Sequence, residues 1–261
     1  MIFDCHAHIF PEHIVDRAMA ALGARYNACP VARPTPDGLL RHMDECAIDR
    51  AVVLAVATKP SQVASINTWL TGLNEPRFIP FGSLHPYQED IAEEIERLVD
   101  LGVRGVKLQP HFQEFGLDDP QLLKMLELIG DRMLVLMHGG QEIVTIEDVQ
   151  PTPQRLLRLH RQVPQVRFMF AHLGAYQQWE AVEEYLVGEE VLFDASYVFD
   201  ICPDEQIERI IRNHGVGKVL WGSDFPWHHG RRGLAGLARL GLSDGERQVI
   251  LSGNALGVLG S

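Results

Sequence analysis

Short apolar runs alternate with amphipathic stretches along the whole chain. Eight runs are rich in Val, Ile, Leu and Phe and show no regular polar face; they cover residues 1–6, 51–57, 77–84, 103–108, 133–138, 166–172, 191–195 and 218–223. Runs of this kind are typical of parallel strands that are covered on both faces. We therefore expect each run to form a buried strand.

Between these runs, apolar residues recur with the spacing of one helix face. The expected helices cover residues 11–25, 37–46, 61–73, 89–101, 119–130, 153–162, 176–187, 204–214 and 243–252. Some have clear ends: Asp119 before Pro120 is a typical helix start, and Gly130 is a typical end. After Asp224, Pro226 and the lack of helical periodicity predict an irregular segment.

Strict alternation of strands and helices predicts right-handed βαβ units and a parallel sheet in an α/β fold. Eight units in 261 residues fit a (β/α)8 TIM barrel, which takes about 250 residues. We expect one domain over residues 1–261. An open doubly wound sheet is the alternative, but no Gly-x-Gly-x-x-Gly or Walker-type loop follows any run.

Composition narrows the range of partners. The formal net charge of −12 argues against nucleic acid or an anionic membrane as the main partner. No run reaches about 18 apolar residues, and the N-terminus has no basic region, so neither a membrane span nor a signal peptide is indicated. The four cysteines form no C-x-x-C pair, which is typical of free thiols. We expect a cytoplasmic protein that acts on a small molecule, and a homo-oligomer is compatible with this fold.

Side chains that bind metals or transfer protons occur where the expected strands end. The first strand ends in His6 and His8, the fourth in Lys107, the fifth in His138, the sixth in His172 and the eighth in Asp224. Residues two apart in a strand project to one side, so His6 and His8 form half of a metal site, and Cys5 should face the opposite side. Because barrel strands end on a common rim, we expect the whole set to converge there.

These residues resemble a known family. The order of D-x-H-x-H at 4–8, His138, A-H-L-G at 171–174 and G-S-D-F-P at 222–226 is similar to that of the amidohydrolase superfamily. Within it, the chain resembles the metal-dependent hydrolases grouped with aminocarboxymuconate semialdehyde decarboxylase, along essentially its whole length. The resemblance implies that His6, His8, His138 and Asp224 bind a divalent ion, with zinc expected. It also implies that His172 and Asp224 are catalytic.

Three further residues are candidates for binding substrate. Lys107 matches a position that is carboxylated and bridges two ions in some members of the superfamily; we expect one ion and an ordinary ammonium, with a second ion only if Lys107 is carboxylated. His111 follows the same strand. Arg231, with its neighbour Arg232, can hold a substrate carboxylate by bidentate hydrogen bonds. A solvated surface pair is the favoured alternative for the two arginines.

Three functions follow from these residues. The expected one is a metal-dependent hydrolase that uses activated water on an amide, lactone or ester. The second is a metal-dependent, non-oxidative decarboxylase of a small carboxylic acid, for which Arg231 or Arg232 facing the metal would be evidence. The third is a non-catalytic barrel with a closed metal site.

Overall fold

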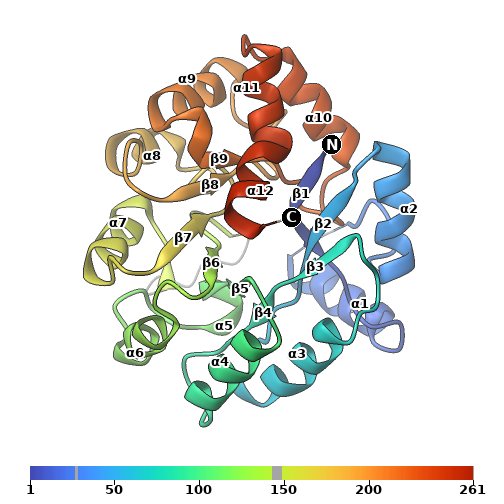
Figure 1. Ribbon diagram of the computed structural model, residues 1–261, viewed down its shortest axis with the longest axis vertical. Coiled ribbons are helices and arrows are strands. Elements are labelled where there is room, and N and C mark those ends of the chain that lie inside the picture. Colours follow the sequence, from blue (N-terminus) through green and yellow to red (C-terminus); the bar gives the residue numbers. More distant parts are fainter. Residues whose placement is uncertain (27–28, 143–148, 261) are drawn as a thin grey trace.

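The computed structural model describes residues 1–26, 29–142 and 149–260 (Figure 1). Its strands are β1 (Phe3–His8), β2 (Arg50–Leu54), β3 (Phe78–Pro80), β4 (Gly82–Ser83), β5 (Gly105–Leu108), β6 (Leu134–Met137), β7 (Arg167–Phe170), β8 (Leu192–Asp194) and β9 (Val219–Leu220). They pair in parallel in the orders β1-β2-β3 and β4-β5-β6-β7-β8-β9.

Helices surround these strands (Figure 1). They are α1 (Val15–Tyr26), α2 (Pro36–Cys46), α3 (Val63–Thr71), α4 (Ile91–Asp100), α5 (Pro110–Gln113), α6 (Pro120–Ile129), α7 (Pro153–Gln162), α8 (Trp179–Tyr185), α9 (Asp204–His214), α10 (Gly230–Arg239), α11 (Asp244–Gln248) and α12 (Asn254–Leu259). Among the described residues, none of the helices combines the length and the apolar character needed to cross a membrane.

Backbone hydrogen bonds join the two sheets into one ring. Only Phe81 separates β3 from β4, and its N–H donates to the carbonyl of Val53 at 3.1 Å, so β3 and β4 act as one kinked strand. At the other seam, the N–H of Cys5 donates to the carbonyl of Trp221 at 3.0 Å, and that of Asp224 donates to the carbonyl of His6 at 2.8 Å. These bonds join β1 to the segment after β9. The predicted β/α barrel is therefore confirmed.

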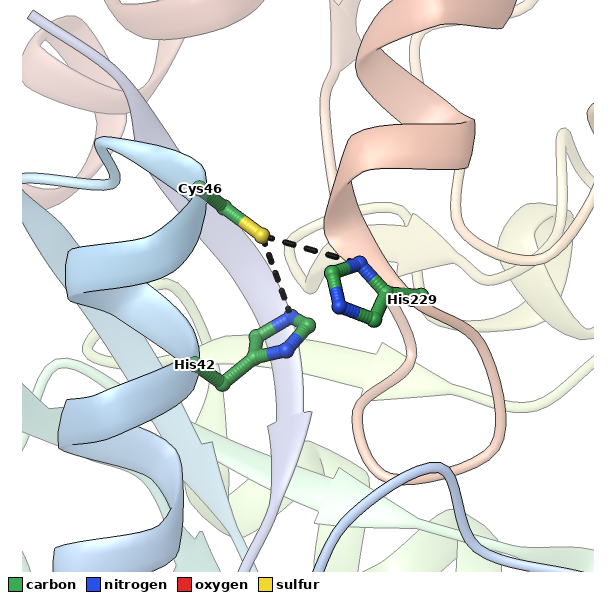
Figure 2. A group of neighbouring side chains, drawn as sticks. All are labelled: His42, Cys46 and His229. Atoms are coloured by element: carbon green, nitrogen blue, oxygen red, sulfur yellow. Dashed lines mark hydrogen bonds between the residues drawn. The ribbon is translucent and has the colours of Figure 1, made fainter.

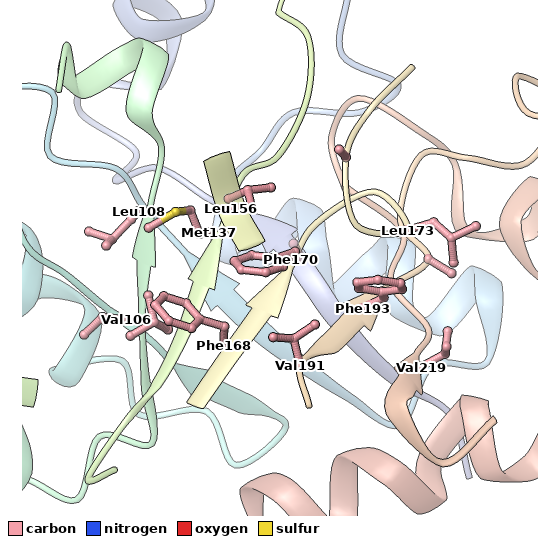
Figure 3. Packing of buried hydrophobic residues seen from close by; sticks show 14 of the residues in the cluster. Val106, Leu108, Met137, Leu156, Phe168, Phe170, Leu173, Val191, Phe193 and Val219 are labelled. Carbon is pink, nitrogen blue, oxygen red and sulfur yellow. The ribbon is translucent and has the colours of Figure 1, made fainter. Parts of the chain in front are cut away.

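The buried apolar residues form two layers. Alternate strand residues such as Leu54, Leu136 and Leu220 fill the barrel, and Ala255 and Leu259 of α12 pack against this inner layer. The intervening residues face outward and pack with apolar residues of the surrounding helices, such as Leu156 of α7. Figure 3 shows part of this outer layer on strands β5 to β9. This alternation places every second residue of a strand inside the barrel. Residues near the strand ends that continue the inward set therefore reach the rim.

The prediction for Cys5 is wrong. Cys5 is 1% exposed and belongs to the inner layer together with Phe3, on the side that carries the imidazoles as well. The register between β1 and β2 shifts between Asp4 and Ala7, where β1 has a bulge or irregularity. A bulge adds one residue to the strand and breaks the simple alternation on which the prediction rested.

Helix α10 occupies a segment that the sequence predicts to be irregular. Its glycines permit close packing: a Cβ on Gly236 would lie 2.4 Å from the ring of Phe199, and one on Gly233 would lie 3.3 Å from Trp221. Each glycine costs an isolated helix about 1 kcal/mol relative to alanine and leaves a gap in the apolar pattern. Tertiary packing therefore overrides the local signal.

Candidate metal centre and active site

A cavity of about 440 Å³ lies at the carboxyl ends of the strands. Its polar lining includes His6, His8, Lys107, Gln109, His138, Gln141, Glu142, His172 and Asp224. Its aromatic lining includes Phe10, Phe112, Tyr176, Tyr197 and Trp227. The structure thus brings together all six residues that the sequence places at the strand ends.

Three ligand-type atoms converge at the bottom of this cavity. The Nε2 atoms of His6 and His8 lie 3.1 Å apart. The Oδ1 atom of Asp224 lies 3.5 Å from the first and 3.6 Å from the second. Two imidazoles and one carboxylate are a common donor set for zinc and similar divalent ions. Three protein ligands leave coordination positions of the ion open for water or substrate. We call these three residues the rim trio.

The orientation of His6 is fixed by a carboxylate that the sequence reasoning missed. Its Nδ1 donates to the Oδ2 of Asp194 at 3.0 Å, because a carboxylate can only accept. The Nε2 of His6 therefore carries a lone pair on the side of His8 and Asp224. A metal-binding histidine held from behind by a carboxylate is a common arrangement, and here the chain supplies it itself. The sequence contained a signal for this residue. Asp194 lies at the carboxyl end of the seventh expected strand, residues 191–195, as the other site residues do on their strands.

His138 and His172 form a second donor set in the same cavity. The Nε2 of His138 donates to the carbonyl of Gln141 at 3.2 Å, and the Nδ1 of His172 donates to that of Ser196 at 3.0 Å. Their remaining nitrogens, 3.1 Å apart, therefore both carry lone pairs. Two facing lone pairs fit a shared cation. His138 thus lies beside His172 rather than within the rim trio, and its role as a ligand stays a prediction.

Lys107 brings a buried positive charge to the same place. Its side chain is 1% exposed, and its Nζ lies 3.4 Å from the Nε2 of His6. Burial lowers the pKa of Lys107 to about 8, although Asp194 and Asp224 oppose the shift. Of the described residues that line the cavity, Lys107 alone carries an ammonium or guanidinium group.

Burial keeps the imidazoles neutral near pH 7. It lowers the pKa of His6, lowers those of His8 and His138 well below the usual value, and lowers that of His172 to about 3. Neutral imidazole is the form that binds metal ions, so none of these rings needs to lose a proton first.

Asp224 occupies a strained position on the rim. Its φ is +61°, a left-handed conformation that is uncommon for residues other than glycine, and His172 has a φ of +60°. Such strain is concentrated at functional sites. Burial raises the pKa of Asp224 well above its usual value, although Lys107 opposes the shift. The buried carboxyl group therefore holds a proton more tightly than an exposed aspartate does when no cation is beside it.

Two predicted substrate-binding residues are not among the described residues that line the cavity. The guanidinium of Arg231 donates to the carbonyl of Glu45 at 2.9 Å and 3.1 Å, and Arg231 does not line the cavity. Arg232 pairs with Asp200 at 3.2 Å. His111 is buried, with its Nε2 3.5 Å from the carbonyl of Gly140, and is not among the described lining residues. The arginines belong to helix α10, which the sequence did not reveal.

The fold and the donor sets define a β/α barrel with a candidate metal site at the carboxyl ends of its strands. The model of one family, Amidohydrolase, matches residues 3–260. The chain therefore belongs to this family, as the sequence motifs predicted. A comparison with curated protein sequences finds no significant match.

Solved structures share the fold at low identity. A 5-carboxyvanillate decarboxylase from Sphingomonas paucimobilis is 15% identical, with a TM-score of 0.74 over 99% of this chain and 98% of the other. A dihydroxybenzoic acid decarboxylase from Polaromonas sp. JS666, with bound manganese, is 16% identical, with a TM-score of 0.72 over 99% and 96%. An uncharacterized TIM-barrel protein from Bordetella bronchiseptica is 16% identical, with a TM-score of 0.76 over 99% and 98%.

Proposed function

We propose that this chain is a metal-dependent, non-oxidative decarboxylase of a small aromatic carboxylic acid. The observation that carries the proposal is the presence of buried Lys107 beside the rim trio in one cavity. A carboxylate can then meet a protein ammonium and a metal ion at the same time. This proposal reverses the order of the two enzymatic functions expected from the sequence.

The donor chemistry fits a divalent ion. His6, His8 and Asp224 would hold it, with His138 as a further proposed ligand and zinc or manganese as the ion. When bound, such an ion supplies positive charge that polarises an oxygen of the substrate. Asp194 would keep the Nε2 of His6 directed toward the ion.

Lys107 replaces the arginine that was expected to bind the carboxylate. Because Arg231 and Arg232 do not line the cavity, they offer no support for decarboxylation. A buried ammonium also binds a carboxylate strongly, since a hydrogen bond to a charged group contributes about 1.5–3 kcal/mol. The carboxylate would gain this interaction at the bottom of the cavity.

The walls of the cavity suit a flat ring. The rings of Tyr176 and Tyr197 lie 5.7 Å apart, and Tyr176 also lies 5.7 Å from the ring of His172. The volume of about 440 Å³ is in the range of small-molecule sites. Similar structures are decarboxylases of 5-carboxyvanillate and 2,6-dihydroxybenzoate, which supports an aromatic acid as the substrate class.

The reaction needs one proton donor. The bond between the ring carbon and the carboxylate breaks, its electron pair remains on the ring carbon, and carbon dioxide leaves. A proton then adds to that carbon. Asp224 and His172 both line the cavity and are the residues proposed to deliver this proton.

Metal-dependent hydrolysis remains the second candidate. The rim trio places a carboxylate 3.5 Å and 3.6 Å from the two imidazole nitrogens, where Asp224 can also accept a proton from water. This arrangement serves an ester, lactone or amide equally well. The same assay can separate the two reactions.

The test begins with chelator-treated protein, reloaded separately with Zn²⁺, Mn²⁺ and Co²⁺. Each form is offered hydroxybenzoic acids and, in parallel, aromatic esters, lactones and amides. We expect carbon dioxide and the decarboxylated ring in equal amounts, only from metal-loaded protein. Hydrolysis without carbon dioxide would replace the proposal with the second candidate. No turnover by any loaded form across the panel would contradict both.

A matched pair of variants links turnover to the site. Asp224→Asn keeps the size of the side chain and removes its negative charge and its ability to transfer a proton. Arg161→Gln changes an exposed charge that pairs with Glu189 on the helical surface and serves as the control. We expect decarboxylation to be lost only in Asp224→Asn.

A further inference from the structure

A second cluster of metal-binding side chains lies outside the cavity. His42 and Cys46 are four residues apart on α2 and so lie on one helix face, and His229 precedes the first residue of α10. The Sγ of Cys46 lies 3.9 Å from the Nε2 of His42 and 3.8 Å from the Nδ1 of His229 (Figure 2). We call these three residues the helix trio.

The spacing of these atoms is close to that of zinc ligands. All three ligand atoms lie within 4.8 Å of one another. Bonds of about 2.0 Å to nitrogen and about 2.3 Å to sulfur in a tetrahedron put the nitrogens roughly 3.3 Å from each other and roughly 3.5 Å from the sulfur. The two sulfur–nitrogen distances therefore exceed this spacing by only a few tenths of an ångström. Side chains on two helices can move that far without any change of fold.

The hydrogen bonds leave suitable nitrogens facing the thiol. The N–H of Gly230 donates to the Nε2 of His42 at 3.2 Å, and that of Arg231 donates to the Nδ1 of His229 at 3.2 Å. Both nitrogens therefore carry lone pairs, and each ring holds its proton on the other nitrogen. A metal ion would replace these two N–H donors.

The surroundings resemble the support that metal sites usually have. The other nitrogen of His229, Nε2, lies 3.7 Å from the Oε2 of Glu45, so its proton points to a carboxylate. Gly230 passes close to the cluster: a Cβ there would lie 3.1 Å from the Nε2 of His42 and 3.2 Å from the Sγ of Cys46. Glycine at this position leaves the space between the two ligands open.

Burial and donor type indicate the class of ion. His42 and Cys46 are 2% and 4% exposed, whereas the side chain of His229 is 31% exposed. The open side can admit water as a fourth ligand. A thiolate with two imidazoles favours zinc over magnesium, calcium or manganese, which prefer oxygen.

We propose that His42, Cys46 and His229 form a second, structural zinc site that fastens α2 to the start of α10. The site would also steady the loop that carries Asp224, because the ring of Phe225 packs against His42 at 4.8 Å. It is independent of the proposed decarboxylation, since none of the three residues is among the described ones that line the cavity.

Cobalt is the probe, because a cobalt ion bound to thiolate gives a near-ultraviolet charge-transfer band that nitrogen and oxygen ligands do not give. We expect the intact chain to show this band, and one equivalent of Zn²⁺ per helix trio to remove it. Cys46→Ser should abolish the band, while His8→Ala in the rim trio should leave it unchanged. Cys29→Ser is the matched control. Cys29 lines the cavity with the rim trio, so its removal should leave the band of the helix trio unchanged.

Two results would overturn the proposal. One is an intact chain that is saturated with cobalt and still shows no band, which would reduce the cluster to a hydrogen-bonded contact between helices. The other is a band that is lost in Cys29→Ser and kept in Cys46→Ser. If Cys46→Ser does not fold, His229→Gln serves instead, because this side chain is partly exposed. It should weaken cobalt binding at the helix trio at least tenfold; unchanged affinity would also contradict the site.

Discussion

The rim trio and the helix trio place similar imidazoles in different surroundings. The rim trio lies at the end of parallel strands beside a cavity of about 440 Å³, with a carboxylate as its third member. The helix trio lies between α2 and the start of α10, with a thiol as its third member and two backbone N–H groups among its contacts. Ligand type alone therefore does not define function. Access to a cavity distinguishes a candidate catalytic site from a candidate structural one.

The largest expected effect separates the two trios by chemistry. Asp224→Asn should lower decarboxylation about 10³-fold, because it removes a charged metal ligand and a group proposed to transfer the proton. The cobalt–thiolate band of the helix trio should stay unchanged in the same variant. Turnover within tenfold of the wild type would show that Asp224 is not needed for the reaction.

Lys107→Met tests the feature that the helix trio lacks, a buried charge for substrate. We expect kcat/KM to fall about 10²-fold, because a charged hydrogen bond contributes up to about 3 kcal/mol. Metal content should not change. Lys124→Met on the exposed surface of α6 is the control. An equal kcat/KM for both variants would remove Lys107 from substrate binding.

A buried histidine outside both trios shows how burial affects the pKa of an imidazole and the stability of the fold. His214 belongs to neither trio; its Nε2 donates to the carbonyl of Val191 at 2.9 Å, and its Nδ1 accepts from Gly188 at 3.2 Å. Burial lowers the pKa of His214 to about 4 in the folded chain. The unfolded chain then binds this proton first, so stability is full above about pH 6.5 and declines toward pH 4.

Urea unfolding of metal-free protein between pH 4 and 7.5 checks this contribution. His214→Gln should lose less stability on acidification than the wild type, by up to about 3 kcal/mol. Identical pH profiles for the two proteins would show that His214 does not contribute. The remaining acid sensitivity would then belong to the other buried groups, including the rings in the two trios.

The smallest expected effect is on zinc affinity at the helix trio and concerns Glu45, which lies beside His229. Glu45→Gln should weaken zinc binding there about tenfold, because the amide orients His229 less firmly than the carboxylate. Competition with a zinc-binding dye measures the change. The rim trio should bind its ion with unaltered affinity, and Glu127→Gln on the exposed surface of α6 is the control. An unchanged zinc affinity would remove Glu45 from the site.

The sequence predicts the rim trio well and the helix trio poorly, for a physical reason. Strand ends of a barrel meet on one rim, so residues at those ends can be placed together without coordinates. His6, His8 and Asp224 were found in this way. No such rule brings a residue of α2 to the start of α10. The pairing of Cys46 with His229 depends on helix packing over 183 residues of chain.

The same reasoning explains the other misses. Helix α10 was hidden because its glycines are chosen for packing against Phe199 and Trp221, not for helix propensity. Arg231, a candidate for substrate binding, lies on that helix and contacts Glu45, which agrees with the surface alternative that the sequence favoured. A bulge or irregularity in β1 puts His6 on the same side of the strand as Cys5. Asp194, at a strand end, could have been predicted by the rule that found the other residues.

The central claim is that His6, His8 and Asp224 hold the ion on which turnover depends. Its most direct test is the decarboxylation rate of chelator-treated protein during titration with Mn²⁺ or Zn²⁺, in the wild type and in His8→Ala. We predict that the wild type regains activity as metal is added and that His8→Ala does not. Full activity in the metal-free wild type, or equal recovery in His8→Ala, would contradict the claim.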